Sequence, residues 1–121
     1  MININDELVG LHKKIIKNGM FNTTMPEKDR QYIFAYISKK NNCDFCYTTH
    51  LANANNLGFR SEFFNKDLID LIDKLYDDLS FTDTTIDPQI QLQIKFIILF
   101  ANFSNDAIKI GALPLGKNNE H

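Results

Sequence analysis

Two cysteines and a histidine are the residues of this sequence whose types and spacing could do chemistry together. Cys43 and Cys46 stand three apart, and His50 follows four residues later. Positions i, i+3 and i+7 of a helix share one face, so these side chains line up if the segment is helical. Helical residues three apart have Cα atoms about 5 to 6 Å from each other, a separation that a disulfide can bridge. The spacing therefore permits reversible oxidation of the cysteine pair.

The position of the pair at the start of a predicted helix favours a reactive thiolate. Unpaired backbone N–H groups and the positive end of the helix dipole lower the pKa of a thiol in the first turn. His50 lies one turn beyond Cys46 and can take its thiol proton. We therefore assign Cys46 as the attacking thiolate and Cys43 as the partner that condenses with the sulfenic acid to form the disulfide. The reverse order stays open, because Cys43 has the stronger dipole effect and the greater exposure.

Helical patterns account for most of the chain, and no segment requires a strand. We expect Asn42 to cap the helix that carries the cysteines, Gly58 to end it, and Asp87 with Pro88 to start the last long helix. The aspartates of the fourth helix are expected to form a solvated face. In all, the pattern predicts five or six helices, over about residues 6–18, 26–40, 43–57, 66–79, 89–103 and 105–110.

Length predicts a single domain over residues 1–121, with 117–121 as a frayed tail, and the helical patterns make that domain all-α. A chain of 121 residues that is 44% hydrophobic, with ten phenylalanines, can bury a core without disulfide or metal staples. The two cysteines therefore require a chemical reason. The last long helix is unusually apolar for so small a chain, which predicts a homo-oligomer.

Charge and hydropathy argue against several classes of partner. Thirteen Lys and Arg against fifteen Asp and Glu give a net charge of −2, whereas nucleic-acid binders carry a basic face. The most apolar run, residues 94–103, is far shorter than the roughly 20 residues that cross a bilayer. Residues 1–7 have neither a basic region nor an apolar stretch of secretory length. We expect no nucleic-acid or membrane partner and a cytoplasmic location.

The Cys-x-x-Cys-x-x-x-His pattern on one helix resembles the alkylhydroperoxidase D (AhpD)-like branch of the carboxymuconolactone decarboxylase superfamily. Residues 30–33, then Ser38 and Asn41, lead into the motif as in that family's core unit, and residues 51–58 follow it similarly. Residues 100–116 are similar to the tail of its peroxidase-related members. Decarboxylase members of the superfamily typically lack the cysteine pair, so its presence favours the redox branch.

The resemblance implies a compact helical bundle that assembles into trimers or hexamers, with the motif on the third helix. It implies thiol-dependent reduction of hydroperoxides or disulfides, with electrons from a lipoyl-bearing protein or a thioredoxin-like donor. The implied site is Cys46, Cys43 and His50, and the redox-active disulfide takes the place of a separate cofactor. Tyr47 and Phe45, beside the motif cysteine, are expected to pack or to form the pocket wall.

One position departs from the family pattern. The family has a glutamate twelve residues before the first motif cysteine, as the outer member of a proton relay to the histidine, and this chain has Gln31 there. Glutamine can orient an imidazole by hydrogen bonding but cannot accept its proton. Glu27, one helical turn earlier on the same face, is the candidate to replace it. We therefore expect low activity, or a substrate other than a peroxide.

Three other interpretations of the motif stay open. The chain could be a non-enzymatic binding or scaffold member of the same fold, in which the change at Gln31 has removed catalysis. The cysteines could be ordinary buried residues, since free Cys is among the most buried types. They could also bind zinc with His50 and a fourth group such as His12. We expect no metal, because structural zinc sites usually bring further ligands from a distant segment and the chain has no second cysteine pair.

Overall fold

The described part of the chain is built from helices. A computed structural model describes residues 6–7, 10–11, 14 and 25–111. Within residues 25–111 there are four α-helices, one short 3-10 helix and no strand, which confirms the all-α prediction. The predicted first helix falls mostly outside the described residues, as do His12 and the tail. The elements are α2 (Glu27–Lys40), α3 (Asp44–Asn56), η2 (Ser61–Phe63), α4 (Lys66–Asp77) and α5 (Pro88–Lys109).

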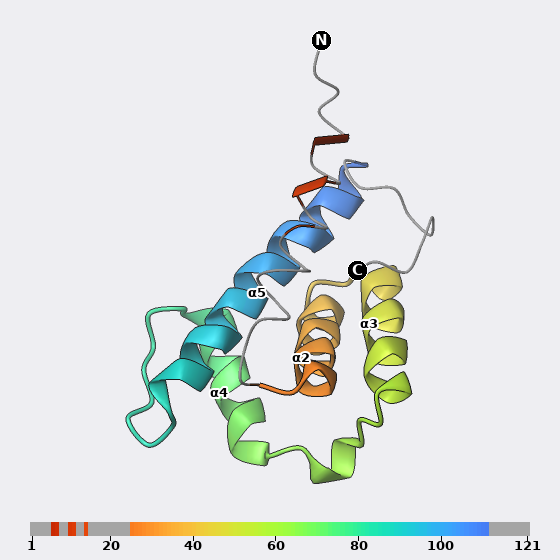
Figure 1. The fold of residues 1–121 in the computed structure, drawn as a ribbon. Coiled ribbons are helices and arrows are strands. Elements are labelled where there is room, and N and C mark those ends of the chain that lie inside the picture. Colours follow the sequence, from red (N-terminus) through yellow and green to blue (C-terminus); the bar gives the residue numbers. More distant parts are fainter. Residues whose placement is uncertain (1–5, 8–9, 12–13, 15–24, 112–121) are drawn as a thin grey trace.

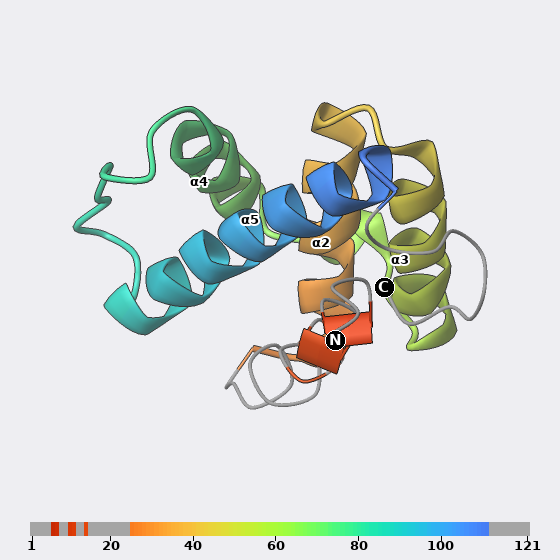
Figure 2. The same cartoon turned by 90° about the horizontal axis from the view of Figure 1, so that it is seen from above.

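The helices are arranged around the long α5. Helices α2 and α3 lie side by side, and α5 crosses α2 so that its C-terminal end reaches the start of α3 (Figures 1 and 2). Apolar residues at helical spacing on α2, α4 and α5 face one another and are withdrawn from water, which stabilises this arrangement. The centre of this core consists of Ile33, Phe34, Ile37, Leu71, Ile72, Leu75, Ile94, Ile97 and Ile98.

Local side-chain bonds fix the starts of two helices. The Asp87 carboxylate accepts a hydrogen bond from the Gln89 N–H at 2.7 Å, and Pro88 is the first residue of α5, as predicted. The Asn65 side chain caps α4 in the same way, accepting from the Asp67 N–H at 2.8 Å. Gly58, with φ of +89°, follows the last residues of α3, where a left-handed conformation favours glycine.

Two helix boundaries differ from the prediction. Asn42 does not cap α3: Cys43 is the N-cap residue, and Asn42 adopts φ of +59° in the short connector from α2. Asparagine tolerates this left-handed conformation better than other non-glycine residues, which explains its presence at the reversal. The predicted break between residues 103 and 105 is also wrong, because α5 runs without interruption to Lys109. Ser104 and Asn105 are polar but fully buried, and the Asn105 side chain bonds to Asn41 and Ser38 instead of ending the helix.

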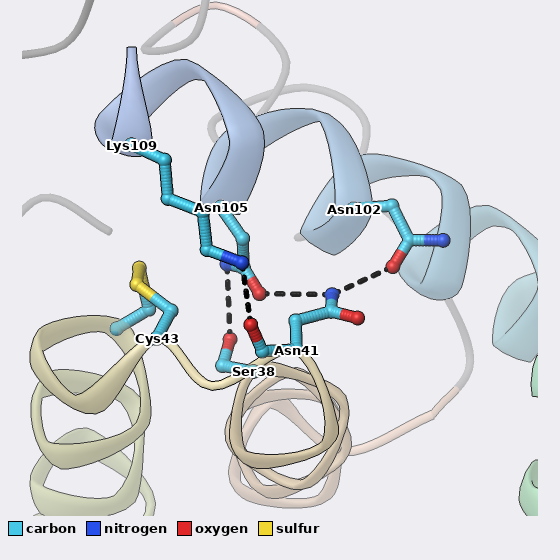
Figure 3. The surroundings of a disulfide bond; sticks show 7 residues. Ser38, Asn41, Cys43, Asn102, Asn105 and Lys109 are labelled. Carbon is cyan, nitrogen blue, oxygen red and sulfur yellow. Dashed lines mark hydrogen bonds between the residues drawn. A yellow bond between two sulfur atoms is a disulfide. The ribbon is translucent and has the colours of Figure 1, made fainter. Parts of the chain in front are cut away.

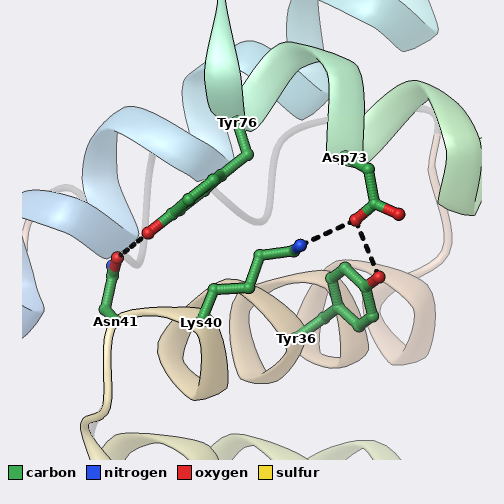
Figure 4. Close-up of polar contacts among 5 residues, drawn as sticks. All are labelled: Tyr36, Lys40, Asn41, Asp73 and Tyr76. Carbon is green, nitrogen blue, oxygen red and sulfur yellow. Dashed lines mark hydrogen bonds and ion pairs between the residues drawn. The ribbon is translucent and has the colours of Figure 1, made fainter.

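The acidic face of α4 is only partly solvated. The Asp73 carboxylate accepts a hydrogen bond from the Tyr36 hydroxyl at 2.8 Å and forms an ion pair with Lys40 Nζ at 2.8 Å (Figure 4). Burial alone would raise the pKa of Asp73, but the hydrogen bonds from Lys40 and Tyr36 outweigh it and lower that pKa. Burial, together with the hydrogen bond to Asp73, raises the pKa of Tyr36 to about 12. Asp73 thus joins α4 to α2.

We expect the stabilising effect of Asp73 to depend on pH. Since its pKa is lower in the folded than in the unfolded state, its contribution is present above about pH 4 and is lost as the pH falls through the folded-state pKa. Urea unfolding should show Asp73→Asn to be less stable than wild type by under ~1 kcal/mol at neutral pH, because the pair is partly exposed. The difference should vanish near the acid limit of folding. A difference in the free energy of unfolding that grows at low pH would contradict this role of Asp73. Asp70→Asn, on the same helix, is the control.

Candidate functional site

The structure joins Cys43 and Cys46 in a disulfide, with Cα atoms 5.4 Å apart. Cys43 is the N-cap of α3, and Cys46 lies in its first turn. The backbone N–H of Cys43 donates to the Ser38 carbonyl at 3.0 Å, and its carbonyl accepts from the Tyr47 N–H at 2.9 Å. The backbone of Cys43 is therefore bonded both to the end of α2 and to the first turn of α3.

Both cysteines are buried. Cys43 is 6% exposed and Cys46 is 0% exposed, so Cys43 is the more exposed of the two, as expected, but both are withdrawn from solvent. The reason is that α5 continues past the predicted break and packs Ala107 and Ile108 against the disulfide, with Phe45 beside it. Apolar burial raises the pKa of a thiol and opposes the lowering effect of the helix start. A base near Cys46 therefore matters more than the sequence alone indicates.

His50 is held in one orientation by α2. Its Nδ1 lies 2.6 Å from the Gln31 Oε1 atom, and both side chains are buried. Asn53 Nδ2 donates to the same oxygen at 3.5 Å, which indicates that the carbonyl end of the glutamine faces the ring. Because a carbonyl oxygen only accepts, Nδ1 carries the proton and Nε2 is the basic nitrogen of the neutral imidazole. The Phe34 ring stacks on the imidazole with centroids 3.7 Å apart and restricts its rotation.

The remaining predicted site residues lie around this centre in different ways. Gln31 hydrogen-bonds to His50. Glu27 lies one turn earlier, half-buried at the start of α2. Burial lowers the pKa of Arg30, and the negative charge of Glu27 partly opposes this by raising it. Phe45 packs against the disulfide, whereas the half-buried Tyr47 ring lies 5.2 Å from Lys39 Nζ.

A polar cluster beside the disulfide was missed by the sequence prediction. Asn41 Nδ2 donates to Asn102 Oδ1 at 2.7 Å and to Asn105 Oδ1 at 3.0 Å (Figure 3). Lys109 Nζ donates to the Asn41 carbonyl at 2.6 Å. Asn102, Asn105 and Lys109 stand at i, i+3 and i+7, so a polar stripe on this apolar helix was the available signal. Because asparagine also favours helix ends, the same residues predicted a break in the helix instead.

Metal binding and membrane insertion receive no support within the described part of the chain. No three His, Cys, Asp or Glu side chains gather there into a group that could hold a metal ion. His12, the fourth candidate zinc ligand, is outside that part. None of the helices described is long and apolar enough to cross a membrane.

Comparison of the chain with protein-family models, with curated proteins and with solved structures finds no match. The expected resemblance to AhpD-like proteins gains no support from these comparisons.

Proposed function

We propose that the protein is a thiol-dependent oxidoreductase that reduces a hydroperoxide or a disulfide. The observation that carries this proposal is a Cys43–Cys46 disulfide at the start of α3, on the helix whose His50 is oriented by Gln31. A cysteine pair that can close on itself stores two electrons, and an imidazole with a fixed basic nitrogen can activate one of the thiols. We extend the proposal to an AhpD-like bundle as the fold.

In the proposed reaction, His50 takes the thiol proton of Cys46, and the thiolate attacks the terminal oxygen of a hydroperoxide. The O–O bond breaks, the alkoxide takes the proton from the imidazolium and leaves as an alcohol, and Cys46 becomes a sulfenic acid. The Cys43 thiol then attacks the Cys46 sulfur, so that the S–S bond forms and water leaves. A dithiol donor reduces the disulfide and is itself oxidised to a disulfide. The proton returns to the leaving group, so this cycle needs no glutamate relay at Gln31.

The partners belong to the same proposal. The reductant would be a lipoyl-bearing protein or a thioredoxin-like protein in the cytoplasm, and the disulfide would serve without a further cofactor. Consumption of an alkyl hydroperoxide by the reduced protein, with dihydrolipoamide as the donor, tests the proposal. Turnover that requires Cys46 supports it, and equal background rates for wild type and Cys46→Ser would refute it.

A second candidate is a non-enzymatic binding or scaffold protein with a structural disulfide. The burial of both sulfurs favours it, because a buried pair is protected from exchange. The two candidates differ in one consequence of substituting Gln31→Glu. In the enzyme, a carboxylate beside His50 raises the basicity of the ring and changes the rate, whereas in the scaffold the rate stays at background.

An apolar stripe on α5 supports the proposal of a homo-oligomer. Leu92, Phe96, Leu99 and Phe103 are 60%, 42%, 55% and 38% exposed. Their 4-3-4 spacing is that of a helix seam that packs against another helix. If a second copy runs antiparallel about a two-fold axis near residue 101, Leu99 faces Phe103 of the other copy. A two-fold contact of this kind occurs in a hexamer and not in a cyclic trimer.

Charge favours a second copy as the occupant of this stripe. In the antiparallel pairing, Asp106 of one copy lies opposite Phe96 of the other, and therefore beside Lys95. The acidic and basic residues are three turns apart on α5 within one chain, so only a second, reversed copy brings them together. Two such ion pairs form across each two-fold axis.

We expect Leu99→Lys to reduce the mass of the particle in sedimentation velocity to that of a single chain or a smaller oligomer. The substitution places two like charges near the centre of the proposed contact, which disfavours association. Thr82→Lys adds the same charge in an exposed loop and should leave the mass unchanged. A wild-type protein that sediments as a monomer at high micromolar concentration would contradict the proposed contact.

A further inference from the structure

The connector between α2 and α3 places Cys43. It consists of Asn41, Asn42 and Cys43, and it reverses the chain through the left-handed Asn42. Cys43 makes no side-chain capping bond to α3. Its position relative to Cys46 is therefore set by the backbone of the connector as well as by the disulfide.

Asn41 anchors that connector with all of its hydrogen-bonding groups. Its side-chain N–H groups donate to Asn102 and Asn105 of α5, and its backbone carbonyl accepts from Lys109 of the same helix (Figure 3). Its side-chain oxygen accepts from the Tyr76 hydroxyl of α4 at 2.6 Å (Figure 4). Its backbone N–H donates to the Ile37 carbonyl at 3.0 Å. A short connector with this many partners from two other helices cannot shift without breaking several bonds at once.

The same two turns of α5 also cover the sulfurs. Asn105, which accepts from Asn41 and donates to Ser38 Oγ at 3.2 Å, stands two residues before Ala107 in the apolar cover of the disulfide. Asn105 and Ser38 are fully buried. The residues that anchor the Cys43 backbone and those that cover its sulfur thus belong to one packed unit. None of the hydrogen bonds described for Asn41 and Asn105 involves a sulfur atom.

We propose that Asn41 is a positioning residue that keeps Cys43 within bonding distance of Cys46 when the disulfide is reduced. This inference deepens the proposed function and rests on it, because only a redox cycle requires the two sulfurs to meet again. Held by Asn41, the thiols have a high effective concentration toward each other, which favours the disulfide. Loss of the anchor lets the connector move in the dithiol form and favours that form.

The test measures the ratio of disulfide to dithiol when the full-length protein is equilibrated with a glutathione buffer. In this equilibrium, the protein dithiol reacts with oxidised glutathione to give the protein disulfide and two molecules of reduced glutathione. We expect Asn41→Ala to lower the ratio of disulfide to dithiol about tenfold, equivalent to ~30 mV for this two-electron couple. Tyr76→Phe, which removes one bond to Asn41 and keeps the ring, should lower the ratio about twofold to threefold. The second variant decides the matter if the first does not fold.

Tyr36→Phe is the matched control, because it removes one hydrogen bond of similar length between α2 and α4 away from the connector. It should leave the ratio at the wild-type value. If Asn41→Ala and Tyr76→Phe also keep the wild-type ratio, Asn41 is merely structural and the inference is wrong. The glutathione equilibrium uses no peroxide, so it tests Asn41 separately from the proposed peroxidase function. If only the peroxidase function is wrong, the protein shows no peroxide turnover, but the variants still shift the ratio of disulfide to dithiol.

Discussion

We expect Cys46→Ser to lower the hydroperoxide turnover of the reduced protein about a hundredfold or more, to the rate without protein. A serine hydroxyl at position 46 is a far weaker nucleophile than a thiolate, and it cannot form a sulfenic acid or a disulfide. Turnover is measured as peroxide loss with dihydrolipoamide in excess. Circular dichroism of reduced wild type and reduced Cys46→Ser shows whether the helices are the same, so that the loss can be assigned to chemistry.

Cys43→Ser distinguishes the two cysteines. With Cys46 as the attacking thiol, this variant, reduced and freed of donor, consumes one peroxide per chain and retains the sulfenic acid, since no other protein thiol can resolve it. A dimedone label, read by mass spectrometry, should then lie on Cys46. A label on Cys43 in the Cys46→Ser protein, with none on Cys46 in the Cys43→Ser protein, would reverse the assigned roles.

His50→Gln should slow the first oxidation step about a hundredfold at neutral pH, the usual size of a general-base contribution. The loss should shrink as the pH rises through the thiol pKa, ordinarily about 8.5, because the thiolate then forms without a base. Stopped-flow mixing of reduced protein with one equivalent of hydroperoxide measures this step alone.

Gln31→Leu is the companion variant for the histidine. It removes the acceptor for Nδ1–H and keeps the side-chain volume, so the imidazole can present either tautomer to the thiol. We expect a loss of several-fold with an unchanged pH profile. If His50→Gln gives the wild-type rate at every pH, the histidine is a packed core residue beneath Phe34 and has no role as a base.

Features set by neighbouring residues were predictable, and features set by distant ones were not. The start of α5 at Asp87 and Pro88 was predicted because the capping bond spans two residues. The continuation of α5 through Ser104 and Asn105 was not, because the partners of the Asn105 side chain, Asn41 and Ser38, lie more than sixty residues away. In a long apolar helix such as α5, polar residues can indicate a tertiary contact as readily as the end of the helix.

The candidate site divides in the same way. The spacing of Cys43, Cys46 and His50 defines their shared helix face, and the Cα separation of 5.4 Å agrees with the expected 5 to 6 Å. The orienting role expected of Gln31 required only that α2 and α3 pack side by side. The burial of the sulfurs arises from the end of α5, which no pattern near the motif encodes.

The most direct measurement is the oxidation state of the tryptic peptide 41–60, which contains both cysteines between the cleavage sites at Lys40 and Arg60. The protein is reduced, freed of reductant, mixed with one equivalent of hydroperoxide, quenched with an excess of alkylating agent in denaturant, and digested. We predict that the peptide carries an internal Cys43–Cys46 disulfide and no alkyl group, while a sample kept without peroxide carries an alkyl group on each cysteine. Alkylation of both cysteines after peroxide treatment would contradict the assignment of this pair as a redox centre.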